Sequence, residues 1–85
     1  MGLNVYKVGE LNPRIQSIIS LIREKRQQRG VSQGDVAADL GLHRPSYTII
    51  EAGRQHLTAE QLVHLVELLE IDWNEIRRAV NLHGR

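Results

Sequence analysis

Residues 31–53, VSQGDVAADLGLHRPSYTIIEAG, hold two short helix-forming segments separated by one glycine, Gly41. The first segment opens with Ser32, and Asp35 follows three residues later. This spacing is typical of a helix start, because a serine hydroxyl there accepts a hydrogen bond from a free backbone N–H. Glycine adopts positive φ without steric penalty, so Gly41 suits the turn that ends the segment. We predict a helix that begins at Ser32 and stops at Gly41.

The second segment predicts a helix from about Arg44 to Ala52, with Gly53 as its stop. Pro45 is acceptable there because the first-turn N–H groups of a helix have no partner within it. His43 is a poor N-cap compared with Ser or Thr, so this start is the least well signalled.

The second helix has two unlike sides, since helical residues advance by about 100° each. Tyr47 and Ile50 fall together on one side, which we expect to face the core. The opposite side carries Arg44, Pro45, Thr48 and Ile49, with Ser46 between the two. A surface that combines an arginine, a hydroxyl and apolar groups differs from an ordinary solvated face.

Three further helices are predicted around this pair. One starts at Asn12-Pro13 and ends at Gly30, one starts at the capping box in residues 58–61, and one starts at residues 72–75. Their apolar positions follow helical spacing: Ile15, Ile18, Ile19 and Ile22; Leu62, Leu65, Val66 and Leu69; Trp73, Ile76 and Val80. No β-branched run alternates with period two, so the predicted class is all-α with five helices.

Length and composition limit the protein to one small domain, since the chain has 85 residues. We expect an N-terminal arm at 1–11, the domain at 12–82 and a C-terminal tail at 83–85. The absence of cysteine excludes disulfides and thiolate metal sites. No apolar run approaches the roughly 20 residues that span a membrane, and the first residues lack a signal-peptide pattern. We expect a cytoplasmic protein with no membrane partner.

Charge is distributed unevenly along the chain. Residues 11–56 carry seven basic and four acidic side chains, a balance of +3, whereas residues 57–85 carry three and five, a balance of −2. Such a basic half suits contact with a polyanion on one side, although ordinary solvated charge explains it equally well.

The stretch from Leu21 to Trp73 resembles the helix-turn-helix domain of the phage-repressor and Cro-like (Xre-type) family. The matching residues are Arg26, Gly30, Ser32, Gln33, Ala37, Gly41, Leu42, Ile50, Glu51 and Gly53. The resemblance implies a five-helix lambda-repressor-like bundle and a sequence-specific transcriptional regulator, a repressor that binds double-stranded DNA. Residues 42–58 look most like family members associated with toxin–antitoxin or phage-related regulation.

The resemblance also implies which residues touch DNA. In the family the position of Gln33 binds a phosphate, and the positions of Arg44, Pro45 and Ile49 face base edges. The full predicted set is Gln33, Arg44, Pro45, Ser46, Thr48, Ile49, Arg54 and Gln55. Arginine can bind guanine O6 and N7 with two hydrogen bonds, whereas Pro45 and Ile49 depart from the family's polar residues and offer only apolar contact. Arg26 and Glu51 match positions that form an internal ion pair, and Lys25 stands where leucine is usual, which predicts shallower packing.

Each predicted contact has a plainer alternative. Gln33 and Arg44 are also consistent with solvated side chains, and Ile49 with packing against the loop after Gly53 or against a partner. The alternative function is an antitoxin or adaptor module whose main role is to bind a protein partner, such as a toxin.

Surplus apolar residues point to a homodimer. Core stripes leave Val63, Leu68, Ala79 and Leu82 unassigned, and Trp73 is too large for one short helix to cover. In small repressors of this kind the last helix commonly pairs about a two-fold axis, so we predict Trp73, Ile76 and Val80 at or beside that interface. The alternative is that these residues complete the monomer core.

Enzymatic chemistry has no support in the sequence. His43, His56, His64 and His83 lack a metal-ligand spacing, so solvated or capping roles are expected. No nucleophile triad, paired carboxylates or phosphate-binding glycine loop occurs in a suitable context. We expect a non-enzymatic protein without metal or cofactor.

Overall fold

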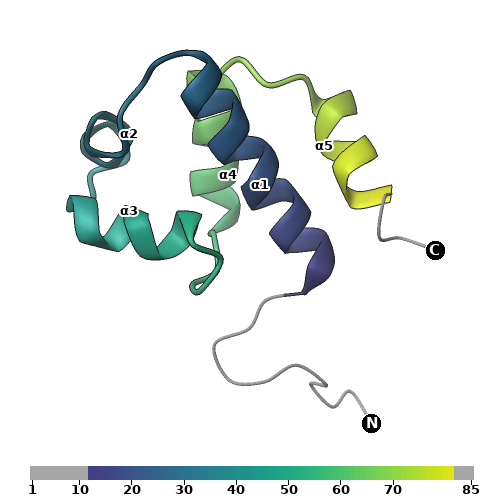
Figure 1. The fold of residues 1–85 in the computed structure, drawn as a ribbon, viewed down its shortest axis with the longest axis horizontal. Helices are drawn as coiled ribbons and strands as arrows, with labels where there is room; N and C mark the ends of the chain where they lie inside the picture. Colours follow the sequence, from purple (N-terminus) through teal and green to yellow (C-terminus); the bar gives the residue numbers. More distant parts are fainter. Residues whose placement is uncertain (1–11, 82–85) are drawn as a thin grey trace, which may run out of the picture.

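The computed structural model describes residues 12–81 and contains five helices within that range (Figure 1). They are α1 (Pro13–Gln28), α2 (Gln33–Asp39), α3 (Arg44–Glu51), α4 (Ala59–Leu68) and α5 (Trp73–Asn81). Residues 12–81 form no strand, so the all-α prediction with five helices is confirmed. The predicted arm at 1–11, the tail at 83–85 and Leu82 lie outside the described residues.

Side-chain caps begin the helices at the predicted places. Asn12 Oδ1 accepts a hydrogen bond of 2.7 Å from the backbone N–H of Arg14. Ser32 Oγ accepts one of 3.0 Å from the N–H of Asp35. The Thr58 and Gln61 side chains each accept a 3.0 Å bond from the backbone N–H of the other residue. His43, the residue before α3, makes no side-chain cap bond, as its poor capping propensity predicts.

The ends of α1 to α4 share one hydrogen-bond pattern but not one residue type. Three helices end at a glycine with positive φ, and at Gly41 (φ +73°) the following Leu42 N–H donates to Ala37 O over 2.8 Å. At the end of α4 the same role falls to Glu70, with φ +52°. Glu70 bears a Cβ in the left-handed region, which is a steric strain that glycine avoids.

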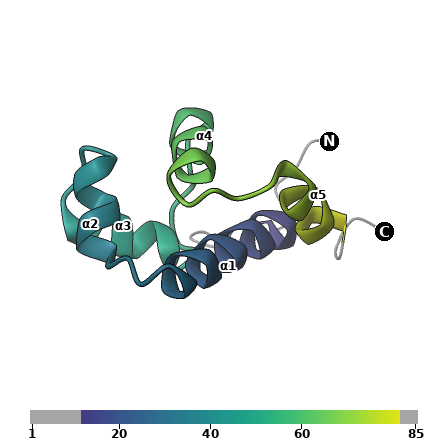
Figure 2. The same ribbon diagram turned by 90° about the horizontal axis from the view of Figure 1, so that it is seen from above.

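A core of aliphatic side chains and one tyrosine holds the helices together. Its buried members are Ile18, Ile22, Val36, Ala37, Tyr47, Leu65, Val66, Leu69, Ile71 and Ile76. Tyr47 and Ile50 are buried, as predicted, so the opposite side of α3 faces outward. In both views α2 and α3 lie on one side of the molecule and α5 lies on the other, with α1 extending between them (Figures 1 and 2).

Polar contacts fasten α1 to the last two helices. Lys25 Nζ lies 2.7 Å from Glu75 Oε1, and both side chains are half-buried. The hydrogen bond from Lys25 holds the pKa of Glu75 below its usual range. Arg29 Nε donates a 2.6 Å hydrogen bond to Leu69 O at the end of α4. Lys25 therefore binds α5 through an ion pair at the position where leucine is usual, a contact that its residue type alone does not reveal.

The strain at Glu70 predicts that glycine suits this position better than alanine. Glu70→Gly and Glu70→Ala both remove the exposed contact with Arg29, which is 3.3 Å long. Only Glu70→Gly also removes the Cβ. We therefore expect the free energy of unfolding of Glu70→Gly to be about 1 kcal/mol higher than that of Glu70→Ala. Urea denaturation of the two variants measures the difference, and equal midpoints would show that no strain is stored there.

Candidate nucleic-acid interface

The pairing of α2 with α3 sets the geometry of the candidate interface. Val36 and Ala37 of α2 are buried in the same core as Tyr47 of α3. The Gly41 turn connects the two helices, and α2 and α3 pack against each other (Figure 1). Because the inner sides of both helices are fixed in the core, the outer side of α3 faces solvent in a fixed orientation.

Most of the predicted contact residues lie on the surface. Exposed side chains are Arg44, Pro45, Thr48, Ile49, Arg54 and Gln55. Ile49 is 44% exposed, because it lies on the side of α3 that faces away from the core. Ser46 and Gln33 are half-buried. The structure thus brings the residues from Arg44 to Ile49 together on one helix.

The start of α3 lies next to the first turn of α2. A Cβ placed on Gly34 would lie 3.8 Å from Arg44 Cδ, so the arginine stem crosses the surface of α2 at this glycine. The Arg44 guanidinium therefore has access to the outer side of both helices. That position suits a contact with a base edge from α3 or with a phosphate beside α2.

An ion pair lies beneath this surface and confirms the prediction for Arg26 and Glu51. Arg26 Nη2 lies 2.7 Å from Glu51 Oε1, and Arg26 Nε lies 2.8 Å from Glu51 Oε2, so the pair is bidentate. Arg26 Nη1 also donates a 2.8 Å hydrogen bond to Val31 O. Glu51 is only 3% exposed. The arginine therefore joins α1, the α1–α2 connection and the last turn of α3.

The ion pair keeps both of its members, Glu51 and Arg26, in their charged forms. Burial alone would raise the pKa of Glu51, but hydrogen bonds from Arg26 and Gln33 outweigh it and hold that pKa below its usual value. The hydrogen bond to Glu51 likewise raises the pKa of Arg26. Both groups are therefore charged at neutral pH.

Tyr47 is the buried neighbour of this pair. Burial, reinforced by the Glu51 carboxylate, raises the pKa of the Tyr47 phenol. Its hydroxyl forms no hydrogen bond of good geometry with the described residues. Tyr47 thus stays neutral and contributes packing beneath α3.

The Gln33 side chain makes two hydrogen bonds within the protein. Its predicted role, contact with a DNA phosphate, did not include either of them. Its Nε2 donates to Glu51 Oε1 over 3.1 Å, and its Oε1 accepts from Thr48 Oγ1 over 2.9 Å. The sequence hints at neither bond, because each joins residues of different helices. Gln33 is therefore held in one orientation between the ion pair and the outer face of α3.

The loop after α3 is held by α1. Gln16 Nε2 donates a hydrogen bond of 3.4 Å to Gly53 O. Gly53 has φ +75°, which favours glycine, and a Cβ there would lie 2.4 Å from Gln16 Oε1 and displace that side chain. Arg54 follows directly, and its position depends on a contact that the sequence analysis did not identify.

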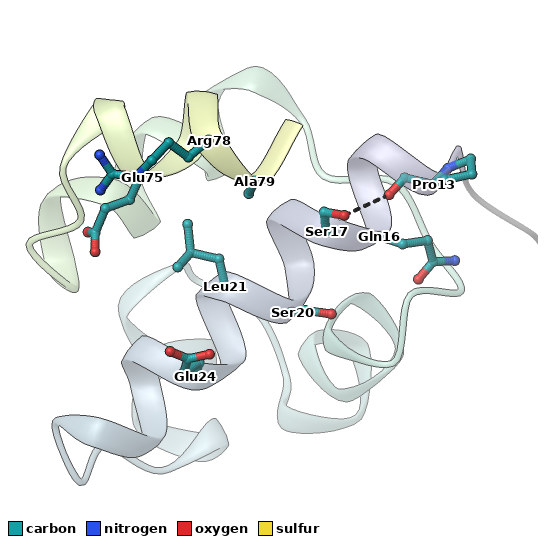
Figure 3. Close-up of a pocket in the computed structure, with 9 residues that line it drawn as sticks. All are labelled: Pro13, Gln16, Ser17, Ser20, Leu21, Glu24, Glu75, Arg78 and Ala79. Atoms are coloured by element: carbon teal, nitrogen blue, oxygen red, sulfur yellow. Dashed lines mark hydrogen bonds between the residues drawn. The ribbon is translucent and has the colours of Figure 1, made fainter. Parts of the chain in front are cut away.

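Two hollows lie away from the α3 face. One, of about 620 Å³, lies between α1 and α5, where Leu21 points towards Arg78 and Ala79 (Figure 3). The other lies over α4 and includes His64, whose Nε2 is 2.5 Å from Asp39 Oδ2. His64 thus contacts α2, whereas the sequence predicts only a solvated or capping role. No group of three or more potential metal ligands occurs within residues 12–81.

The residues predicted at a dimer interface occupy three different environments. Trp73 is 52% exposed at the start of α5. Ile76 is buried in the monomer core, and Val80 is half-buried against it. Ile76 therefore supports α5 from the inside, and Trp73 is the member that remains accessible.

The comparison with protein families agrees with this geometry. A helix-turn-helix family model matches residues 22–76, which is more than half of the chain. The chain belongs to the Xre-type, lambda-repressor-like helix-turn-helix family, whose domains bind DNA in transcription regulation. No curated protein and no solved structure matches the chain. Within residues 12–81, the helices are too short or too polar to cross a membrane.

The buried ion pair predicts non-additive losses of stability. Arg26→Met or Glu51→Leu alone leaves one charge buried without its partner, which costs about 3–5 kcal/mol of unfolding free energy. The double variant leaves no such charge and should be more stable than either single one. Urea denaturation of all three measures this, with Lys25→Met as a control for a half-buried pair that should lose less. A double variant less stable than both single variants would contradict the prediction.

Proposed function

We propose that this protein is a sequence-specific DNA-binding repressor that acts as a dimer on an inverted repeat. The observation that carries the proposal is the outer face of α3, where Arg44, Thr48 and Ile49 are exposed while the other side of the helix is buried. A helix anchored in this way suits insertion into the major groove, which is wide enough to admit it. Such a role needs no catalytic group. We propose a cytoplasmic location, where a bacterial or phage regulator would meet DNA.

Two kinds of contact divide the predicted residues. Arg44 and Ile49 contact base edges, with Pro45 and Ser46 beside them, because they lie at the start and centre of the outer face. The sugar-phosphate backbone of DNA is contacted from either side of that face by Gln33, Arg54 and Gln55. Base contacts specify sequence, whereas phosphate contacts fix register and orientation.

We expect Arg44→Ala and Arg54→Ala to weaken DNA binding in different ways. Arg44→Ala should cost about 1–3 kcal/mol on the preferred site and relax the preference at one base pair. Arg54→Ala should weaken all sequences alike and lower the slope of log affinity against log salt by about one. The measurement is the affinity of each variant for the preferred site and its single-base variants at several salt concentrations.

Because Arg44 also lies close to α2, it could contact a phosphate in place of a base edge, and the same measurements distinguish the two roles. If Arg44→Ala loses affinity equally on every sequence and lowers the salt slope, then Arg44 is a phosphate anchor. Specificity would then come from the rest of the α3 face. Ile49→Ala serves as the comparison variant, since it should lose less affinity, and mainly at a thymine methyl group.

Dimerisation is proposed through α5. Trp73 offers a large exposed apolar surface, and α5 lies across the molecule from α2 and α3 (Figures 1 and 2). Pairing through α5 leaves both recognition surfaces free. A two-fold dimer would then present two α3 helices to half-sites about 34 Å apart.

The dimer proposal predicts that Trp73→Ala weakens self-association while the fold is kept. About half of Trp73 is exposed, so its removal should cost less monomer stability than the loss of a fully buried tryptophan would. Sedimentation at micromolar concentration measures the dimer, and Val63→Ala, which changes an exposed apolar residue on α4, is the matched control. A wild-type protein that stays monomeric both alone and on DNA would exclude the dimer.

A second function is supported by the apolar character of the same face. Pro45 and the exposed Ile49 suit a protein surface as well as a thymine methyl group, and they favour an antitoxin or adaptor that binds a protein such as a toxin. Salt separates the two functions, because counterion release makes DNA binding fall steeply with salt while binding through an apolar face changes much less.

A further inference from the structure

A continuous chain of hydrogen bonds runs from the buried ion pair to the outer face of α3. Glu51 Oε1 accepts from Arg26 Nη2 and from Gln33 Nε2, at 2.7 and 3.1 Å. Gln33 Oε1 then accepts from Thr48 Oγ1 over 2.9 Å. Glu51 is buried, Arg26 and Gln33 are half-buried, and Thr48 is exposed. The chain therefore connects the interior with a side chain on the recognition surface.

The chemistry of the four groups gives this chain a fixed direction. A carboxylate can only accept hydrogen bonds, so the Gln33 group that faces Glu51 must be the NH₂ group. The Gln33 carbonyl oxygen then faces Thr48, and because it can only accept, the Thr48 hydroxyl must donate. The single hydroxyl hydrogen of Thr48 is used inside the protein, and only lone pairs of its oxygen remain for a ligand.

The direction is stable because the carboxylate stays ionised. Arg26 gives Glu51 two hydrogen bonds, and water is excluded from it. An uncharged glutamic acid could donate to Gln33 and allow its amide to turn, but the arginine opposes that state. A threonine hydroxyl in water can donate or accept a hydrogen bond, whereas here Glu51, through Gln33, makes the Thr48 hydroxyl a donor to Gln33.

We propose that Thr48 acts as an obligate hydrogen-bond acceptor on the DNA-binding face and selects a base edge that donates. In the major groove the donors are the N6 amino group of adenine and the N4 amino group of cytosine. Gln33 and Glu51 are positioning residues for this contact, since they act on the base only through Thr48. The inference rests on the proposed DNA-binding function and adds a specificity-determining residue to it.

A first experiment finds the base pair that Thr48 reads. Wild type, Thr48→Val and Thr48→Ser each select sites from random double-stranded DNA. Thr48→Val keeps the shape and the methyl contact but has no hydroxyl, whereas Thr48→Ser keeps the hydroxyl and loses the methyl group. We expect Thr48→Val to lose the preference at one base pair that wild type and Thr48→Ser share.

A second experiment identifies the chemical group, because every base pair carries both a donor and acceptors. At that position the exocyclic amino group is replaced by hydrogen, with purine for adenine or 2-pyrimidinone for cytosine. Wild type and Thr48→Ser should lose affinity about threefold to tenfold, the range of one hydrogen bond, and Thr48→Val should lose none beyond its own deficit. Removal of the keto oxygen of the opposite base should show no such coupling to Thr48.

Gln33→Met tests the positioning role while the Arg26–Glu51 pair is kept. This change frees the Thr48 hydrogen, so the hydroxyl can donate or accept, and the penalty for exchanging the two bases of the pair should shrink. The variant also loses a phosphate contact, which lowers affinity on all sequences and leaves their ranking unaffected. If Gln33→Met discriminates as well as wild type, Gln33 does not set the polarity of Thr48.

The outcomes separate this inference from the function on which it rests. Wild-type protein that selects no DNA sequence would overturn both. A selected site that is identical for wild type and Thr48→Val would leave DNA recognition intact and overturn the inference. Coupling of Thr48 to the keto oxygen, in place of the amino group, would show that the hydroxyl donates and would overturn it as well.

Discussion

The bidentate ion pair between Arg26 and Glu51 is the constraint on which the outer face of α3, the proposed DNA-binding face, depends. Glu51 closes α3 at a place that water does not reach, and a carboxylate there is tolerable only with a partner that satisfies both oxygens. Arg26 does so from α1 and uses its remaining nitrogen for Val31 O. One guanidinium thereby fixes the end of α3 relative to α1 and to the start of α2. Apolar packing of Tyr47 and Ile50 holds the same helix by its inner side, but such packing has no direction.

The directional contacts also reach the surface residues. Gln33 is oriented by the charge of Glu51, and Thr48 is oriented by Gln33. On the other side of the face, Gln16 holds Gly53 and with it the start of the loop that carries Arg54. Two polar contacts from outside α3 thus position Thr48 within the surface and the loop that follows it. The proposed DNA-binding face is thereby held in place before any ligand binds, which lowers the side-chain entropy that binding would cost.

Local signals in the sequence predicted the helices well, since caps and glycine stops act over three or four residues. Asn12, Ser32 and Thr58 cap as expected, and His43 does not. The end of α4 carried no such signal, because Glu70 takes positive φ where the other helices use glycine. The Arg26–Glu51 pair was predictable only through the family resemblance. Contacts of Lys25 with Glu75 and of His64 with Asp39 depend on how helices cross, which spacing along one chain does not encode.

The uneven charge of the chain has a different meaning once the contacts are known. Among the basic side chains of residues 11–56, Lys25, Arg26 and Arg29 pair with carboxylates inside the molecule or at its edge. The excess of basic residues in that half therefore overstates the charge available to a polyanion. On the α3 face and the loop after it, Arg44 and Arg54 are the exposed cations. One copy of the face therefore offers few phosphate anchors for the proposed DNA contact. Two linked copies would bind more tightly than one, which is the physical reason for proposing a dimer.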